Sequence, residues 1–387
     1  MSTFLESARR IAVDVAAPNA ASVDAQSRFP SEAIDALKEA GLLGALVPDA
    51  LDGPAVDFVT VFAICYLLGR YCASTAMIFA MHQIQVACLL LHHRDVEWQR
   101  DFLRRIAREQ LLLASATTEG GIGGDLSRSS CAVLRDGNRF TIEKRGTVIS
   151  YGENADAVLI TARAGPASLP TDQVIAVALK PQCTLERTAG WDALGMRGTC
   201  SNSYLLRAAG HVDQVLKDPY SEISPHTMVP VAHLTWSSVW LGIATDAVAK
   251  ARTFVSRQKH PVGEGIQPSA NAMRLAAAVS QLQAMKANIV SAARLYEAAA
   301  KSQDGASLSF SIAMNNLKTS TATRAVEVIN QAMLICGIAG YKNDTPFSLG
   351  RHLRDAHSAA LMVNNDRIDA NTASLLRVHK LDGDLFD

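Results

Sequence analysis

The chain has 387 residues, of which 49% are hydrophobic, 19% are charged and 6% are aromatic, and its formal net charge is zero. This length permits two or three domains with buried cores, and the composition is that of a globular protein rather than a disordered one. A neutral chain with few aromatic side chains and no long basic run is not expected to bind nucleic acid.

Three zones follow one another along the chain. Residues 1–112 carry helical patterns, among them a helix predicted to begin around Ser31. Residues 113–222 alternate short apolar or β-branched runs with Gly, Pro, Asn and Asp, which is typical of an antiparallel β-sandwich or barrel. Residues 223–387 return to long, alanine-rich helical patterns that suit a four-helix bundle. The predicted fold class is α+β multidomain: a helical domain, a middle β domain and a helical bundle.

The cysteines and the most apolar segment indicate in which cellular compartment the protein resides. The seven cysteines are scattered and never form a C-x-x-C pair, which argues against a disulfide framework and a zinc site and favours a reducing compartment. The first residues lack the apolar centre of a secretory signal. Polar residues interrupt the apolar stretch 58–91, so we expect buried helices there rather than a membrane span. The sequence predicts a cytoplasmic protein without a metal ion.

The most distinctive short motif is the stretch SATTEGGIGGD at residues 115–125. Its four glycines in five positions allow backbone to approach a ligand closely or to adopt positive φ. It is not a Walker loop, because no lysine follows Gly124, and Leu126 stands where a dinucleotide fingerprint needs its third glycine. Taken alone, the stretch is also compatible with an ordinary turn, so the surrounding motifs decide.

Six segments along the chain resemble, in the right order, motifs of the acyl-CoA dehydrogenase superfamily of flavoproteins. They are FPSEAIDALKEAGLLGALVPDALDG, TTEGGIGGD, GTVISYGENADAVLITAR, GWDALGMRGTCSNSYLL, WLGIATDAVAKARTFVSRQ and CGIAGYKNDTPFSLGRHLRDA. The resemblance covers nearly the whole chain, and it implies the same order of a helical, a β and a second helical region, with FAD as the cofactor.

The resemblance also implies which residues bind FAD. The expected contacts are Thr117 and Thr118 at the pyrimidine edge, Gly123 and Gly124 near the phosphates, and Ile149 and Ser150 near N5. N–H and hydroxyl donors suit that edge because a flavin that accepts a hydride gathers negative charge there. Arg257 and Gly337 fall where a neighbouring subunit would complete the site, which implies a homotetramer or a dimer.

The glutamate that acts as the family's catalytic base is missing from both of its positions. Val363 stands at the position after R-D-A, and Ala232 stands at the position on the first bundle helix. The reaction still needs a proton acceptor at the substrate. Asp366, one helical turn beyond Val363, is the predicted replacement base, and His233 is the second predicted catalytic residue. Each also has a purely structural explanation, Asp366 as an exposed acid and His233 as a hydrogen-bonded histidine of the core.

Two functions fit these residues. The preferred one is α,β-oxidation of an acyl thioester of coenzyme A or an acyl carrier protein, with an electron-accepting flavoprotein or reductase as partner. The alternative is a two-component monooxygenase of the same fold, which receives reduced flavin and does not need the glutamate. Pockets of such monooxygenases commonly offer histidines, and His82 and His233 fit that description. Acyl length and carrier stay open at this stage.

Overall fold

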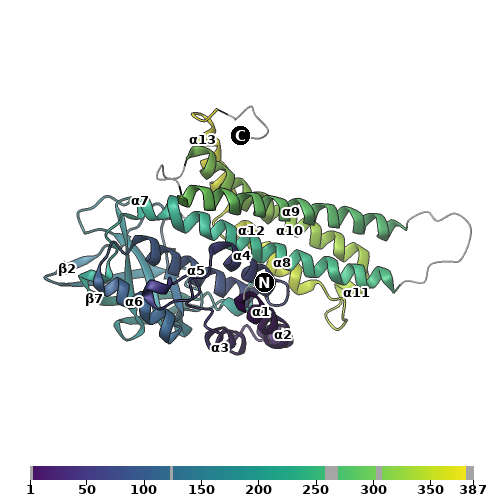
Figure 1. The fold of residues 1–387 in the computed structure, drawn as a ribbon, viewed down its shortest axis with the longest axis horizontal. Coiled ribbons are helices and arrows are strands. Elements are labelled where there is room, and N and C mark those ends of the chain that lie inside the picture. The colour runs from purple at the N-terminus through teal and green to yellow at the C-terminus, as the bar shows by residue number, and fades with distance from the viewer. Residues whose placement is uncertain (1–2, 123–124, 258–268, 302–306, 381–387) are drawn as a thin grey trace, which may run out of the picture. The chain divides into compact units, whose positions relative to one another are not determined.

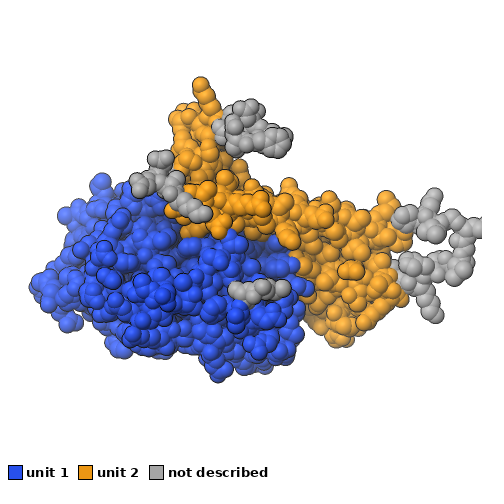
Figure 2. All heavy atoms as spheres, viewed as in Figure 1, with its two compact units in different colours: residues 1–242 blue, residues 243–387 orange. Residues whose placement is uncertain are grey.

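The computed structural model describes residues 3–122, 125–257, 269–301 and 307–380. The chain forms two compact units, residues 1–242 and 243–387 (Figure 2). The order of elements is helical, then β, then helical (Figure 1), so the predicted fold class is confirmed. The boundary between the units lies inside helix α8, and the three-domain division at residues 112 and 222 stays a prediction.

Helices make up the N-terminal half of unit 1. They are α1 (Thr3–Arg10), α2 (Ala17–Ala25), α3 (Ser31–Glu39), α4 (Phe58–Gly69), α5 (Ala73–His92) and α6 (Glu97–Glu109). Helix α3 begins at Ser31, as the sequence predicts. The long apolar stretch forms two helices, α4 and α5, rather than one. Helix α5 is the one described helix whose length and composition would suit a membrane span, and most of it is buried within unit 1.

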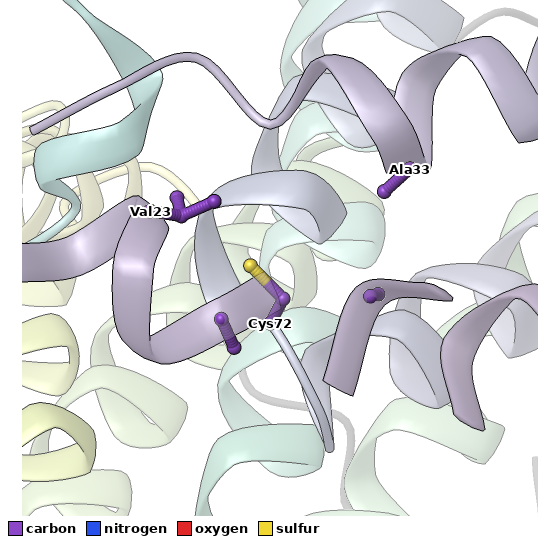
Figure 3. Packing of buried hydrophobic residues seen from close by; sticks show 5 residues of the cluster. Val23, Ala33 and Cys72 are labelled. Carbon is purple, nitrogen blue, oxygen red and sulfur yellow. The ribbon is translucent and has the colours of Figure 1, made fainter. Parts of the chain in front are cut away.

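Small side chains hold the first helices close together. Ala16, Ala20, Val23, Ala33 and Cys72 form one buried cluster, and Figure 3 shows Val23, Ala33 and Cys72 turned toward a common space. Such short side chains let neighbouring helices approach closely without leaving a void. The cluster therefore fixes α2 and α3 against the start of α5.

The strands of unit 1 form two sheets. The strands are β1 (Leu113–Ala116), β2 (Leu134–Asp136), β3 (Arg139–Gly146), β4 (Ala157–Arg163), β5 (Gln173–Leu179), β6 (Cys183–Ala189) and β7 (Ser203–His211). One sheet has the order β1-β4-β5 and the other β2-β3-β7-β6. The pairs are antiparallel as predicted, except that β1 and β4 are parallel. These two strands are joined through β2 and β3 rather than by a hairpin, and such a crossover permits parallel pairing.

Unit 2 contains the end of α8 (Val229–Ser256) and the remaining long helices. These are α9 (Ala270–Lys301), α10 (Leu308–Cys336), α12 (Gly350–Leu361) and α13 (Asn365–Leu376), with the short α11 (Ile338–Tyr341) between α10 and α12. Helix α10 packs against α9, α12 and α13 and is the centre of the unit (Figure 1). Its last residue is Cys336, and the capping residue Gly337 has a φ of 57°, which favours glycine.

Candidate flavin and catalytic site

Thr118 ties the glycine-rich stretch to the segment that follows β3. Its hydroxyl donates to the carbonyl oxygen of Val148 (2.9 Å) and accepts from the Val148 amide (3.0 Å). Ile149 and Ser150, predicted to lie near flavin N5, directly follow that bridge, and Ser150 Oγ contacts Ser201 Oγ at 2.8 Å. Two of the predicted cofactor segments are thus held together within unit 1. The hydroxyl proton of Thr118 is engaged by Val148, so its donation to a flavin stays a prediction.

The glycine-rich part of the stretch begins at Gly120, two residues after Thr118. Thr117 is half-buried, and the amide of Gly120 donates to a carbonyl of β3 at 3.1 Å. Gly121 has a φ of 90°, which a side chain would strain, and a Cβ built on it would meet no atom within 4 Å. Gly121 is itself exposed, so this position faces solvent. Gly123 and Gly124 lie outside the described residues, and their contact with the phosphates stays a prediction.

Glu119 is a buried anchor of this loop that the sequence analysis missed. Its carboxylate accepts hydrogen bonds from Ser129 Oγ (2.7 Å), from the Cys131 amide (2.9 Å) and from both the amide and the hydroxyl of Ser130. Lys144 Nζ lies 3.7 Å from it, and both side chains are almost fully buried. The carboxylate therefore fastens the threonine segment to residues 129–131 and to β3.

The charges of this pair follow from their surroundings. Burial lowers the pKa of Lys144, whose ammonium donates to the carbonyl oxygen (2.6 Å) and the hydroxyl (3.0 Å) of Thr161. Burial alone would raise the pKa of Glu119, but hydrogen bonds from Ser130 and Ser129 and the charge of Lys144 outweigh it, and the pKa lies below its ordinary value. One signal in the sequence could have indicated this pair: Lys144 occupies an inward-facing position of β3, in which buried and exposed residues alternate, and a lysine there needs a buried partner.

We expect Glu119→Gln to lower the free energy of unfolding by about 2 kcal/mol and to weaken flavin binding, because it removes a charge-assisted network. Urea unfolding and flavin titration measure both effects. Glu143→Gln is the matched control, since Glu143 is an exposed acid of β3.

The pKa of Glu119 is lowered in the folded state, so the contribution of Glu119 to the free energy of unfolding is full above the unfolded pKa of about 4.3. That contribution is lost as the pH falls through the folded pKa. Equal losses in the two variants would contradict the anchoring role.

The two predicted catalytic residues lie in different units. His233 is on the first part of α8 in unit 1, 2% exposed, with its ring centroid 6.4 Å from that of Trp236. Asp366 is exposed in the first turn of α13 in unit 2, and its backbone amide donates to Asn364 Oδ1 at 2.7 Å. Ala232, at one of the family's glutamate positions, is 4% exposed. The catalytic roles of Asp366 and His233 stay predictions.

The residues expected from a second subunit both lie in unit 2. The guanidinium carbon of exposed Arg257 lies 5.4 Å from the ring centroid of Phe347. Gly337 is exposed at the junction of α10 and α11. Large apolar side chains beside it are also exposed in the single chain: Leu334 (58%), Ile338 (73%) and Tyr341 (74%). Exposed apolar side chains of this size, close together in the chain, are typical of a surface that another protein covers.

His82 has a structural role. It is completely buried, and its Nε2 contacts the carbonyl oxygen of Leu43 (2.7 Å) while its Nδ1 accepts from the Leu113 amide (3.0 Å). Burial lowers the pKa of His82 to about 4, so the ring is neutral near pH 7. Because both nitrogens are used inside unit 1, His82 is not the substrate-facing histidine that the monooxygenase alternative invokes.

Comparison with known proteins identifies the family. Residues 2–110 match the acyl-CoA dehydrogenase N-terminal domain, and residues 234–363 match the acyl-CoA dehydrogenase C-terminal domain. The chain is 23% identical over 372 residues to the cyclohex-1-ene-1-carbonyl-CoA dehydrogenase of Geobacter metallireducens, covering 94% of each protein. It is 24% identical to the mitochondrial short-chain specific acyl-CoA dehydrogenase of Bos taurus, covering 91% of this chain and 83% of that protein.

Solved structures show the same fold. Butyryl-CoA dehydrogenase from Megasphaera elsdenii has a TM-score of 0.84 at 18% identity, covering 97% of this chain and 99% of the other. The dibenzothiophene monooxygenase TdsC from Paenibacillus sp. A11-2 has a TM-score of 0.83 at 19% identity, covering 98% of each chain. The matches to acyl-CoA dehydrogenase domains and relatives define a flavin-dependent oxidoreductase. The chain belongs to the acyl-CoA dehydrogenase superfamily, as the six sequence segments predict.

Proposed function

We propose that the protein is an FAD-dependent acyl-thioester dehydrogenase of the cytoplasm, which forms a Cα=Cβ bond in its substrate. The family match at both ends of the chain carries the proposal, because its named relatives are acyl-CoA dehydrogenases. Coenzyme A and an acyl carrier protein are the candidate carriers, and a flavoprotein or reductase would accept the electrons.

The cofactor proposal rests on the glycine loop. The bridge between Thr118 and Val148 holds the threonine segment beside Ile149 and Ser150, the segment that the resemblance assigns to the other side of the flavin ring. When bound, FAD would supply the acceptor for the β-hydride. The residues proposed to hold it are Thr117, Thr118, Gly123, Gly124, Ile149 and Ser150, with Arg257 and Gly337 from a second copy of the chain.

The proposed chemistry of the chain is proton abstraction. The Asp366 carboxylate takes the proton from the α-carbon of the thioester, and the electron pair of that C–H bond forms the new double bond to the β-carbon. His233 is proposed to line the reacting end of the pocket. The exposed apolar residues beside Gly337 support a homo-oligomer, in which this surface is covered. We propose a homotetramer or dimer.

A monooxygenase is the second candidate. Both glutamate positions are filled by residues that cannot accept a proton, Val363 and Ala232, and a monooxygenase does not need that base. The fold does not separate the two reactions, since butyryl-CoA dehydrogenase and TdsC both share it.

Flavin reduction separates the two candidates. We expect purified protein to be yellow, to release FAD on heating and to scatter light as a dimer or tetramer. Anaerobic mixing with a matching acyl-CoA or acyl-carrier thioester will then bleach the oxidised flavin band, because the substrate is the reductant. A protein that stays oxidised with every thioester, yet forms a hydroperoxide band when its reduced flavin meets oxygen, would be the monooxygenase. Release of FMN alone would contradict the FAD proposal.

A further inference from the structure

A buried lysine of α10 holds the loop between α12 and α13. Lys318 is completely buried, and its ammonium donates to the carbonyl oxygen of Val363 (2.7 Å) and to Asn365 Oδ1 (2.7 Å). A buried ammonium is costly unless its donors are satisfied, and these two acceptors lie only two residues apart in the chain. The contact therefore joins the central helix of unit 2 to the loop residue Val363 and to Asn365, the first residue of α13.

The loop has an unusual backbone at the point where the lysine binds it. Val363 has a φ of 48°, in the left-handed region, and it is the one β-branched residue with positive φ among those that the structure describes. This conformation crowds a branched Cβ, so it persists only where surrounding contacts enforce it. The hydrogen bond from Lys318 to the Val363 carbonyl is such a contact.

The same loop sets the start of α13. Asn364 caps the helix by accepting from the Asp366 amide, and Asp366 follows within the first turn. A second polar contact fastens α13 further along, where Asn315 of α10 donates to Asn371 (2.9 Å) and Thr372 (3.1 Å). Asp366 thus lies between two points at which α10 holds the chain.

We propose that Lys318 is a positioning residue for the reaction: its two hydrogen bonds keep Val363 in the left-handed conformation and thereby fix where α13 presents the Asp366 carboxylate. This inference rests on the proposed function, in which Asp366 is the base. Lys318 acts through the loop and does not contact the substrate. Burial lowers the pKa of Lys318 to about 8, opposed by the charge of Asp369 on α13, so at pH 7 it is mostly a cation with three N–H donors.

Four proteins test this positioning role: wild type, Lys318→Met, Val363→Gly and the double variant. Lys318→Met removes the donors and lets Val363 relax, so the limiting rate of thioester bleaching should fall on the order of 10²-fold while the apparent thioester dissociation constant changes little. Val363→Gly alone should keep a rate near wild type. Glycine adopts positive φ without strain, so the double variant should recover about tenfold over Lys318→Met. If Lys318→Met does not fold, Lys318→Gln, which keeps amide donors, should give an intermediate rate.

The matched control is Lys250→Met. Lys250 is a second lysine of unit 2, half-buried, and it donates to the Ser348 carbonyl (3.1 Å) rather than to the α12–α13 loop. Lys250→Met should lower the free energy of unfolding, and the addition of Val363→Gly should not raise the bleaching rate of that variant. An unchanged bleaching rate in Lys318→Met, or a slow double variant without recovery, would overturn the proposal.

Unfolding measurements keep this test separate from the proposed function. If no thioester bleaches the wild type, the dehydrogenase proposal fails, and urea midpoints still report on the lysine contact. Val363→Gly should raise the urea midpoint more when Lys318 is present than in Lys318→Met, because the lysine helps to hold valine in the strained conformation. Equal shifts in the two backgrounds would show that Lys318 does not hold the loop.

Discussion

Asp366→Asn will slow thioester-driven bleaching of the flavin on the order of 10²–10⁴-fold, the usual contribution of a positioned proton acceptor. The amide keeps the size of the carboxylate, although an NH2 donor replaces one acceptor oxygen, and it cannot accept the α proton at neutral pH. Because the Asp366 side chain is exposed in the described chain, its replacement is not expected to change the stability of α13 greatly. Anaerobic stopped-flow absorbance of the flavin band measures the rate.

Two further variants make the result specific to Asp366. Glu297→Gln neutralises another exposed acid of unit 2, on α9, and should leave the rate unchanged. His233→Ala tests the second predicted catalytic residue. A slow His233→Ala beside an unaffected Asp366→Asn would transfer the role of base to His233. Normal bleaching in both variants would mean that neither residue is the base, although the dehydrogenase reaction would stand.

His82→Leu will lower the free energy of unfolding by about 4 kcal/mol. The change leaves the Leu43 carbonyl and the Leu113 amide buried without the ring that now binds both, and each such orphaned group costs about 1–3 kcal/mol. Urea unfolding at pH 7 measures the loss. His357→Leu is the control, since that ring is exposed on α12. Comparable losses in the two variants would contradict the bridging role of His82.

The same ring makes stability depend on pH. The pKa of His82 is lowered to about 4 in the folded protein, against about 6.5 in an unfolded chain. Between these values the unfolded chain binds the proton that the folded ring excludes, so the contribution of His82 is full above pH 6.5 and is lost as the pH falls toward 4. The loss is about 3 kcal/mol. His82→Gln, which cannot titrate, should remove this part of the acid sensitivity, and an unchanged pH profile would contradict it.

The order of the elements could be predicted from the sequence because each element has its own local pattern of apolar and turn-forming residues. Apolar spacing locates α4, α5 and α10, and Gly337 marks where α10 ends. The parallel pairing of β1 with β4 was not predictable in this way, since it depends on two strands that lie between them in the chain. Strand β6 is half-exposed to exposed along its length, so it lacks the apolar alternation that identifies a strand.

Contacts between residues that are far apart in the sequence explain why local patterns do not reveal the roles of Glu119 and His92. Glu119 was within the quoted glycine stretch, but its role depends on Lys144 and on residues 129–131, which fold back to it. His92 is similar: polar residues follow it in the sequence, yet its ring is buried between Asp218 (2.7 Å) and Thr227 (2.9 Å). Local patterns identify a helix or a loop, but they do not show which residue elsewhere in the chain a buried side chain contacts.

The bridge at His82 also limits how this chain can recombine with its relatives. One ring connects the segment before α4, helix α5 and the first residue of β1, so a crossover near residue 112 would take the ring from one parent and the Leu113 amide from the other. Any residue except proline supplies that amide, but only a parent with an acceptor at position 82 satisfies it. In chimeras joined at this point, the parent that contributes α5 therefore decides whether this amide is satisfied, whichever parent contributes the strands.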